Sequence, residues 1–85
     1  MTKMFDWNHL QSLVAVAEHG SLSAAARALG GSQPTMGRHI AVLETELGVR
    51  LFERTAGGLE LTSTGIELLE HARHMADAAN RLSLV

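Results

Sequence analysis

The spacing of apolar residues predicts that the first half of the chain forms three helices. In the first of them, the apolar positions follow the i, i+3, i+4, i+7 spacing of an amphipathic helix. They are Leu10, Leu13, Val14 and Ala17. Asp6 is a favourable N-cap residue and Gly20 is a typical C′ residue, so we expect this helix between them.

Two further helical patterns follow, each bounded by a serine and a glycine. A short helix is expected to begin after Ser21 and to stop at Gly30, with inward positions at Leu22, Ala25, Ala26 and Leu29. A longer one, residues 33–47, is expected to begin after Ser32, and Pro34 lies in its first turn, where a missing N–H costs little. Its inward positions are Met36, Ile40, Leu43 and Leu47, and Gly48 ends it.

Residues 49–62 have the alternating pattern of strands instead. Leu59 and Leu61 flank Glu60, as in a half-buried strand. The glycines Gly57 and Gly58 precede them. We therefore predict two short strands joined by a Gly-Gly turn, with positive φ at the tip.

The last segment predicts one long helix that runs to the end of the chain. It is expected to begin near Thr62 to Thr64, with a capping box between Thr64 and Glu67. One face carries a heptad seam at alternating intervals of four and three, made of Leu68, Ala72, Met75, Ala79 and Leu82. So long a helix extends past a small core, so we expect the seam to pair with a second copy of the chain. The alternative is that the helix folds back on its own domain. The direction of pairing, parallel or antiparallel, stays open.

Helix, short helix, turn, helix and hairpin is the order of a winged helix-turn-helix, whose second helix enters the DNA major groove. On a helical wheel, the outward face of residues 33–47 is small, polar and free of carboxylates near its start. Gln33 can pair with adenine, Arg38 with guanine or a phosphate, and Thr35 with a thymine methyl. The alternatives are that Gln33 is only solvated, that Arg38 pairs with Glu44, and that Arg54 only anchors the hairpin.

The charge distribution changes this picture only in part. The net charge is −2, whereas a DNA-binding domain is expected to present a basic surface. However, residues 21–43 contain no acid and include Arg27, Arg38 and His39, while residues 57–85 carry more acids than bases. The middle of the chain is therefore the candidate contact surface, and it is weakly basic.

Composition excludes several other classes. The 85 residues suit one domain, 46% of them are apolar, and no cysteine is present for disulfides or thiolate metal sites. No apolar run approaches the ~20 residues that span a bilayer, and residues 1–6 do not resemble a signal peptide. We therefore expect a soluble protein without a membrane partner.

Nothing in the sequence is typical of catalysis. There is no acid–base pair in a plausible cleft, no phosphate-binding glycine loop and no nucleophile with a partner, so we predict no enzyme, no cofactor and no small-molecule site. His71 and His74 have metal-ligand spacing, but only two strong ligands share that face, so we predict no metal site. A protein-binding adaptor is the rival hypothesis, supported by the negative charge and by a hairpin tip without arginine.

The ordered motifs resemble the N-terminal domain of LysR-type bacterial transcriptional regulators over nearly the whole chain. They are Leu22-Ser23-Ala24-Ala25-Ala26, Ser32-Gln33-Pro34-Thr35-Met36, Leu43-Glu44, Leu47-Gly48-Val49-Arg50-Leu51-Phe52-Glu53-Arg54, and Leu61-Thr62 with Gly65. The resemblance implies that the positions of Gln33, Pro34, Thr35, Gly37 and Arg38 approach bases and phosphates. Two positions depart from the family: Gly37 replaces the usual serine, and Gly57 replaces the usual second arginine of the wing.

Together these observations predict an all-α fold with a small β-hairpin: a winged helix-turn-helix over residues 1–62 and a dimerisation (linker) helix over residues 63–85. The expected function is sequence-specific binding of double-stranded DNA by a homodimer at an interrupted palindrome, regulating transcription in the cytoplasm at the nucleoid. The resemblance also implies a separate effector-sensing domain, absent from this chain, and allows higher oligomers in a full-length protein. The predicted DNA-binding residues are Ser32, Gln33, Pro34, Thr35, Gly37, Arg38 and Arg54.

Overall fold

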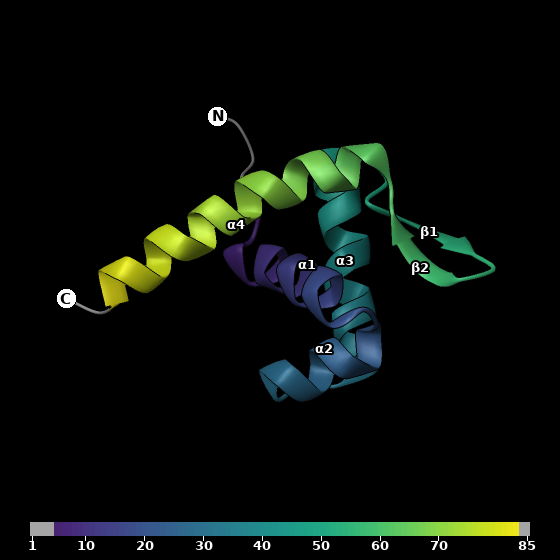
Figure 1. Ribbon diagram of the computed structural model, residues 1–85, viewed down its shortest axis with the longest axis horizontal. Coiled ribbons are helices and arrows are strands. Elements are labelled where there is room, and N and C mark those ends of the chain that lie inside the picture. The colour runs from purple at the N-terminus through teal and green to yellow at the C-terminus, as the bar shows by residue number, and fades with distance from the viewer. Residues whose placement is uncertain (1–4, 84–85) are drawn as a thin grey trace.

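The structure, a computed structural model, describes residues 5–83 and contains four helices and one hairpin within that range (Figure 1). Helix α4 crosses α1 and continues past it toward the C-terminus, while the hairpin projects in the opposite direction (Figure 1). The elements are α1 (Trp7–His19), α2 (Leu22–Leu29), α3 (Gln33–Leu47), β1 (Phe52–Thr55), β2 (Gly58–Leu61) and α4 (Ser63–Ser83).

The first three helices begin and end where the sequence predicts. Each is preceded by a side chain that accepts a hydrogen bond from a backbone N–H of the first turn: Asp6 from Asn8 at 2.8 Å, Ser21 from Ala24 at 3.1 Å, and Ser32 from Thr35 at 3.3 Å. Each ends at a glycine in the left-handed region, where an L side chain would be strained: Gly20, Gly30 and Gly48. The predicted bounds are confirmed.

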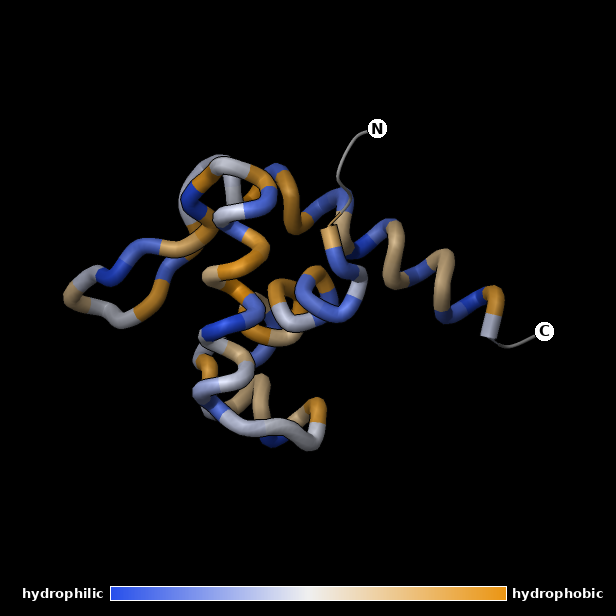
Figure 2. Tube along the Cα trace, turned by 180° about the vertical axis from the view of Figure 1, so that it is seen from behind, coloured by the Kyte–Doolittle hydropathy of each residue, from blue (hydrophilic) through white to orange (hydrophobic). Residues whose placement is uncertain are grey.

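The core lies where α1 and α3 meet under the start of β1. Leu13 of α1, Leu43 of α3 and Leu51, which immediately precedes β1, are fully buried. The inward alanines Ala25 and Ala26 let α2 pack closely against the other two helices. Figure 2 shows the hydrophobic residues gathered at this junction, whereas polar and apolar residues alternate along α4.

The hairpin forms an antiparallel two-stranded wing. Its register pairs Phe52 with Leu61 and Thr55 with Gly58. The turn therefore consists of Ala56 and Gly57, and the predicted Gly-Gly turn is wrong by one residue. Within the hairpin, only Gly58 has a positive φ (109°), and it is the first residue of β2 rather than a residue of the turn.

Helix α4 begins within the predicted region, but its cap differs from the prediction. The hydroxyl of Thr62 accepts a hydrogen bond from the N–H of Gly65 at 2.9 Å and donates one to the carbonyl of Arg50. The predicted capping box between Thr64 and Glu67 is wrong, because the helix begins at Ser63 and Thr64 already lies in its first turn. Thr62 thus joins the segment before the wing to the helix after it.

Gly65 is needed here for space rather than for backbone freedom. A Cβ atom at this position would overlap the backbone carbonyl of Leu51 and approach the Leu61 side chain at 2.9 Å. The carbonyl of Leu51 also accepts a hydrogen bond from the N–H of Thr62 at 2.9 Å, so it is held in place. The first turn of α4 can pack on the core only without a side chain at residue 65.

The heptad seam of α4 is divided between two environments. Leu68 packs on the core and Ala72 is only 1% exposed, because the first half of α4 lies across α1. Met75 and Leu82 are 42% and 76% exposed. The sequence predicted that the whole seam lies beyond the core, but only its second half does. The first half packs back on its own domain, as in the alternative interpretation.

No helix within residues 5–83 combines the length and the hydrophobicity that crossing a membrane requires.

Candidate nucleic-acid interface

The first two turns of α3 expose the residues that the sequence singles out. Gln33, Pro34 and Arg38 are exposed, and Thr35 and Gly37 are half-buried. Met36 and Ile40, on the opposite side of the helix, are buried in the core. The predicted orientation of this helix is confirmed: its apolar stripe packs inward, and its small polar face is open to solvent.

Ser32 and Thr35 form a linked pair at the start of α3. The Ser32 hydroxyl accepts from the N–H of Thr35 and donates to the Thr35 hydroxyl oxygen at 2.9 Å. Ser32 is therefore occupied in capping the helix. The hydroxyl proton of Thr35 is left to donate outward, toward a phosphate or a base edge.

Neither of the two arginines predicted at this surface has an acidic partner within the described part of the chain, where the ion pairs involve His9 and Arg73. Arg38 and Arg54 are both exposed. The alternative in which Arg38 pairs with Glu44 is wrong, because the Glu44 carboxylate accepts hydrogen bonds from the N–H groups of Leu51 (2.7 Å) and Phe52 (3.3 Å). Glu44 thus fixes the start of the wing, and both guanidinium groups remain available.

The fold brings Gln33 and Arg54 to one hollow between the helix-turn-helix and the wing. This hollow has a volume of about 360 Å³, and its polar and glycine lining comes from three segments: Ser21, Ser23, Gln33, Arg54, Gly57 and Gly58. The N-termini of α2 and α3 both reach it, and helix N-termini favour anions. Wing and recognition helix therefore present donors to the same space.

Packing does not explain why Gly37 stands where the LysR-type family usually has a serine. A Cβ atom here would lie 3.7 Å from the Leu22 Cδ1 atom, an ordinary van der Waals contact, and the φ of Gly37 is not positive. A serine would therefore fit at residue 37.

A histidine pair behind this surface was missed by sequence reasoning. The rings of His9 (α1) and His39 (α3) lie 4.7 Å apart, and the Ser12 hydroxyl is hydrogen-bonded to the Nδ1 atom of His39 at 2.8 Å. The pair is flanked by Asp6 and Glu46, whose carboxylates lie 3.9 and 3.8 Å from the His9 ring nitrogens. Ser12 is the buried polar residue of α1, and because it lies outside the predicted apolar stripe, no signal in the sequence indicated this pair.

This packing changes the charge argument made from the sequence. Burial, followed by the charges of His9 and Arg38, lowers the pKa of His39 below 6.5, and Asp6 only partly opposes this. His39 is therefore neutral at pH 7 and does not add to the basic surface. The cations at the proposed surface are arginines.

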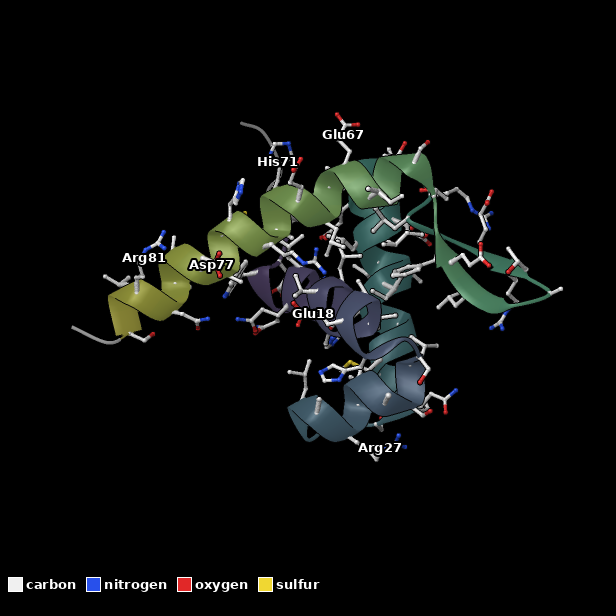
Figure 3. All side chains as sticks on the ribbon, in the orientation of Figure 1. Glu18, Arg27, Glu67, His71, Asp77 and Arg81 are labelled. Atoms are coloured by element: carbon white, nitrogen blue, oxygen red, sulfur yellow. The ribbon has the colours of Figure 1, made fainter. Side chains whose placement is uncertain are left out.

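Helix α4 carries both acids and arginines, with the acids in slight excess. In Figure 3, Arg27 lies on α2, away from α4, whereas Glu67 and Asp77 lie along α4. No cluster of three or more potential metal ligands is found among residues 5–83.

Comparison with known proteins identifies the family. The sequence profile described as "Bacterial regulatory helix-turn-helix protein, lysR family" matches residues 7–66. The chain is 50% identical over 70 residues to the HTH-type transcriptional regulator ClcR of Pseudomonas putida, covering 82% of this chain and 24% of ClcR. It thus spans about a quarter of the length of that relative.

Solved structures agree with the sequence match. The CbnR_DBD–DNA complex superposes with a TM-score of 0.83 at 42% identity, covering 92% of this chain and 90% of that one. The BenM_DBD/benA site 1 DNA complex gives a TM-score of 0.85 at 32% identity, with coverages of 92% and 88%. The predicted winged helix-turn-helix with a long C-terminal helix is confirmed, and the relatives are named as transcriptional regulators, not enzymes. The chain belongs to the LysR family of bacterial regulatory helix-turn-helix proteins, as a DNA-binding domain.

Proposed function

We propose that this domain binds double-stranded DNA sequence-specifically, as a homodimer at an interrupted palindromic operator, and thereby regulates transcription from chromosomal DNA in the cytoplasm. The observation that carries the proposal is the open, acid-free face at the start of α3, with Arg38 unpaired within residues 5–83 and Arg54 across the hollow. That two similar domains were crystallised with DNA supports it.

In this proposal the start of α3 enters the major groove. Gln33 and Arg38 read base edges, since their side chains can pair bidentately with adenine and guanine. Thr35 donates its free hydroxyl proton or contacts a thymine methyl, while Ser32 and Pro34 set the start of the helix. The N–H groups at the helix N-terminus and Arg54 bind phosphates.

The second half of α4 provides the dimer contact in this proposal. Met75, Ala79 and Leu82 continue the seam after Ala72 has been covered by its own chain. Residues 1–62 then act as the DNA-reading part and residues 63–85 as the linker, with the first half of the linker packed on the reading part. Pairing should place two α3 helices in successive major grooves, about 34 Å or a multiple apart.

Selection of bound duplexes from a random library tests the DNA proposal. We expect an interrupted palindrome whose half-sites are about one helical turn or a multiple apart. Arg38→Ala should then weaken binding to the selected duplex by about 1–3 kcal/mol and weaken binding to random duplexes less. Arg81→Ala, which removes an exposed arginine near the far end of α4, is the matched control (Figure 3).

Three results would count against parts of this proposal. Equal losses on selected and random duplexes would make Arg38 a phosphate contact. No loss on either would remove α3 from the groove. A library that returns no sequence would favour the protein-binding adaptor, which the net charge of −2 also allows.

A further inference from the structure

The two faces of the wing carry opposite charges. Side chains alternate along a strand, so Arg54 shares a face with Phe52, which packs on the core. Leu59 and Leu61 lie on that face in the partner strand. The opposite face carries Glu53 and Glu60, which the register places directly across from each other. The wing thus turns its arginine toward the hollow beside α3, and its two carboxylates extend from the opposite face. At the tip, however, Glu60 lies beside Gly57, a residue that lines the hollow.

One of these carboxylates is held at the tip of the wing. The Glu60 Oε2 atom accepts a hydrogen bond from the Thr55 hydroxyl at 2.9 Å. The same hydroxyl oxygen accepts a hydrogen bond from the N–H of Gly57 at 3.2 Å, which ties the carboxylate to the turn. A Cβ atom on Gly57 would lie only 3.2 Å from Oε2. The Thr55 hydroxyl, which also lies 3.2 Å from the Gly58 carbonyl oxygen, thus keeps the negative charge of the exposed Glu60 beside residue 57.

That charge lies close to where DNA would pass. Gly57 and Gly58 line the same hollow as Gln33, the first residue of α3. A duplex seated on α3 that follows this hollow runs along the wing tip, and the tip residues Ala56 and Gly57 offer no cation. A carboxylate held there is repelled most by the narrow minor groove of A·T-rich DNA, whose negative potential is enhanced.

We propose that Glu60 is a specificity-determining residue: held by Thr55 at the wing tip, its carboxylate disfavours A·T-rich sequence beside the site read by α3. This inference rests on the proposed function. It assigns to the wing a repulsive role in the choice of operator, as specificity often requires.

The test measures binding of the full chain to two duplexes that share the selected core but differ in flanks, one A·T-rich and one G·C-rich. Glu60→Gln keeps an acceptor for Thr55 and removes the charge. It should tighten binding to the A·T-flanked duplex by about threefold to tenfold at 50 mM salt, and to the G·C-flanked duplex by less than about twofold. The gain should shrink at 200 mM salt, since salt screens exposed charges.

Glu53→Gln is the matched control, because it removes the same charge at the same level of the ladder from a residue that, among residues 5–83, makes no side-chain hydrogen bond to the turn. Thr55→Val, which releases Glu60 but keeps its charge, should shift binding in the direction of Glu60→Gln by a smaller factor. Circular-dichroism melting of each variant checks that the wing variants fold.

Equal gains from Glu53→Gln and Glu60→Gln would make the effect one of net charge and overturn the proposal, as would a Glu60→Gln variant with unchanged flank preference. Arg38→Ala separates the two levels of failure. If it weakens binding while Glu60→Gln changes nothing, only this inference fails. If no duplex is bound at all, the proposed function fails and this inference with it.

Discussion

The two halves of α4 carry the same heptad spacing but have different surroundings. In the first half, Gly65, Leu69 and Ala72 are buried against the body formed by α1, α2, α3 and the wing. In the second half, Met75 and Leu82 are exposed, and Figure 1 shows the C-terminal part of α4 extending past the body. An exposed ion pair between Arg73 and Glu18, at 3.8 Å, joins α4 to the last turn of α1.

This difference shows what a heptad pattern specifies. The spacing produces an apolar stripe along one face of the helix, but it does not specify what covers the stripe. Here the body covers the first half because Gly65 lets the helix approach it closely. The second half extends past the body, so a second chain is the partner that we propose for it.

The largest expected effect comes from placing the same charge in each half. Ala72→Glu buries a carboxylate among apolar neighbours within one chain and should lower the free energy of unfolding by at least about 3 kcal/mol. Ala79→Glu should leave the fold intact and raise the dimer dissociation constant about 100-fold, equivalent to about 2.8 kcal/mol. Thermal melting and sedimentation equilibrium measure the two effects.

Asn80→Glu adds the same charge to an exposed position outside the seam and should change neither property. A monomeric but folded Ala72→Glu variant would remove the distinction between the halves. A stable Ala79→Glu dimer would place the interface elsewhere.

Gly65→Ala tests the close approach that buries the first half. The new methyl group would overlap the Leu51 carbonyl, so we expect unfolding to become easier by about 3 kcal/mol, the upper range for overpacking. Urea denaturation measures the change. A loss below about 0.5 kcal/mol would show that α4 can shift without cost, since surface substitutions commonly stay within that range.

Gly37→Ala makes the same chemical change at an open helical position in the body. No backbone atom opposes it, and alanine has the higher helix propensity, so we expect a gain of about 0.5–1 kcal/mol in the free energy of unfolding. Denaturation of the two Gly→Ala variants side by side gives opposite signs if local space, rather than the residue type, decides. Destabilisation by Gly37→Ala would mean that α3 needs glycine here.

The smallest effect is expected from acid, and it is confined to the body. The pKa of His39 is lowered in the folded state by burial and by the charges of His9 and Arg38, so the unfolded chain binds protons more readily. Stability from this group is therefore complete above pH 6.5 and decreases as the pH falls below that value. Melting temperatures between pH 5 and 8 measure it.

His39→Gln should reduce this pH dependence, and His74→Gln, on the exposed surface of α4, should not. An unchanged pH profile in His39→Gln would assign the dependence to other groups.

Local signals in the sequence were sufficient for the ends of the first three helices. Ser21, Ser32 and the glycines Gly20, Gly30 and Gly48 act within a few residues of the chain, so caps and helix ends could be read directly. The exposed face of α3 could be predicted as well, because its apolar stripe is buried and leaves the opposite face open to DNA. The predicted position of the hairpin turn was wrong by one residue. Three small residues in a row, Ala56 to Gly58, are compatible with more than one strand register.

What the tertiary structure decided depends on side-chain contacts between different segments of the chain. Glu44 binds the start of the wing instead of Arg38, burial and then the charge of His9 lower the pKa of His39, and Glu60 lies at the wing tip through Thr55. Helical or strand periodicity cannot indicate these partners, because it records only which face of an element is apolar. The sequence determined the elements and the exposed face of α3; the packing of α4 on α1 determined which half of the seam remained open.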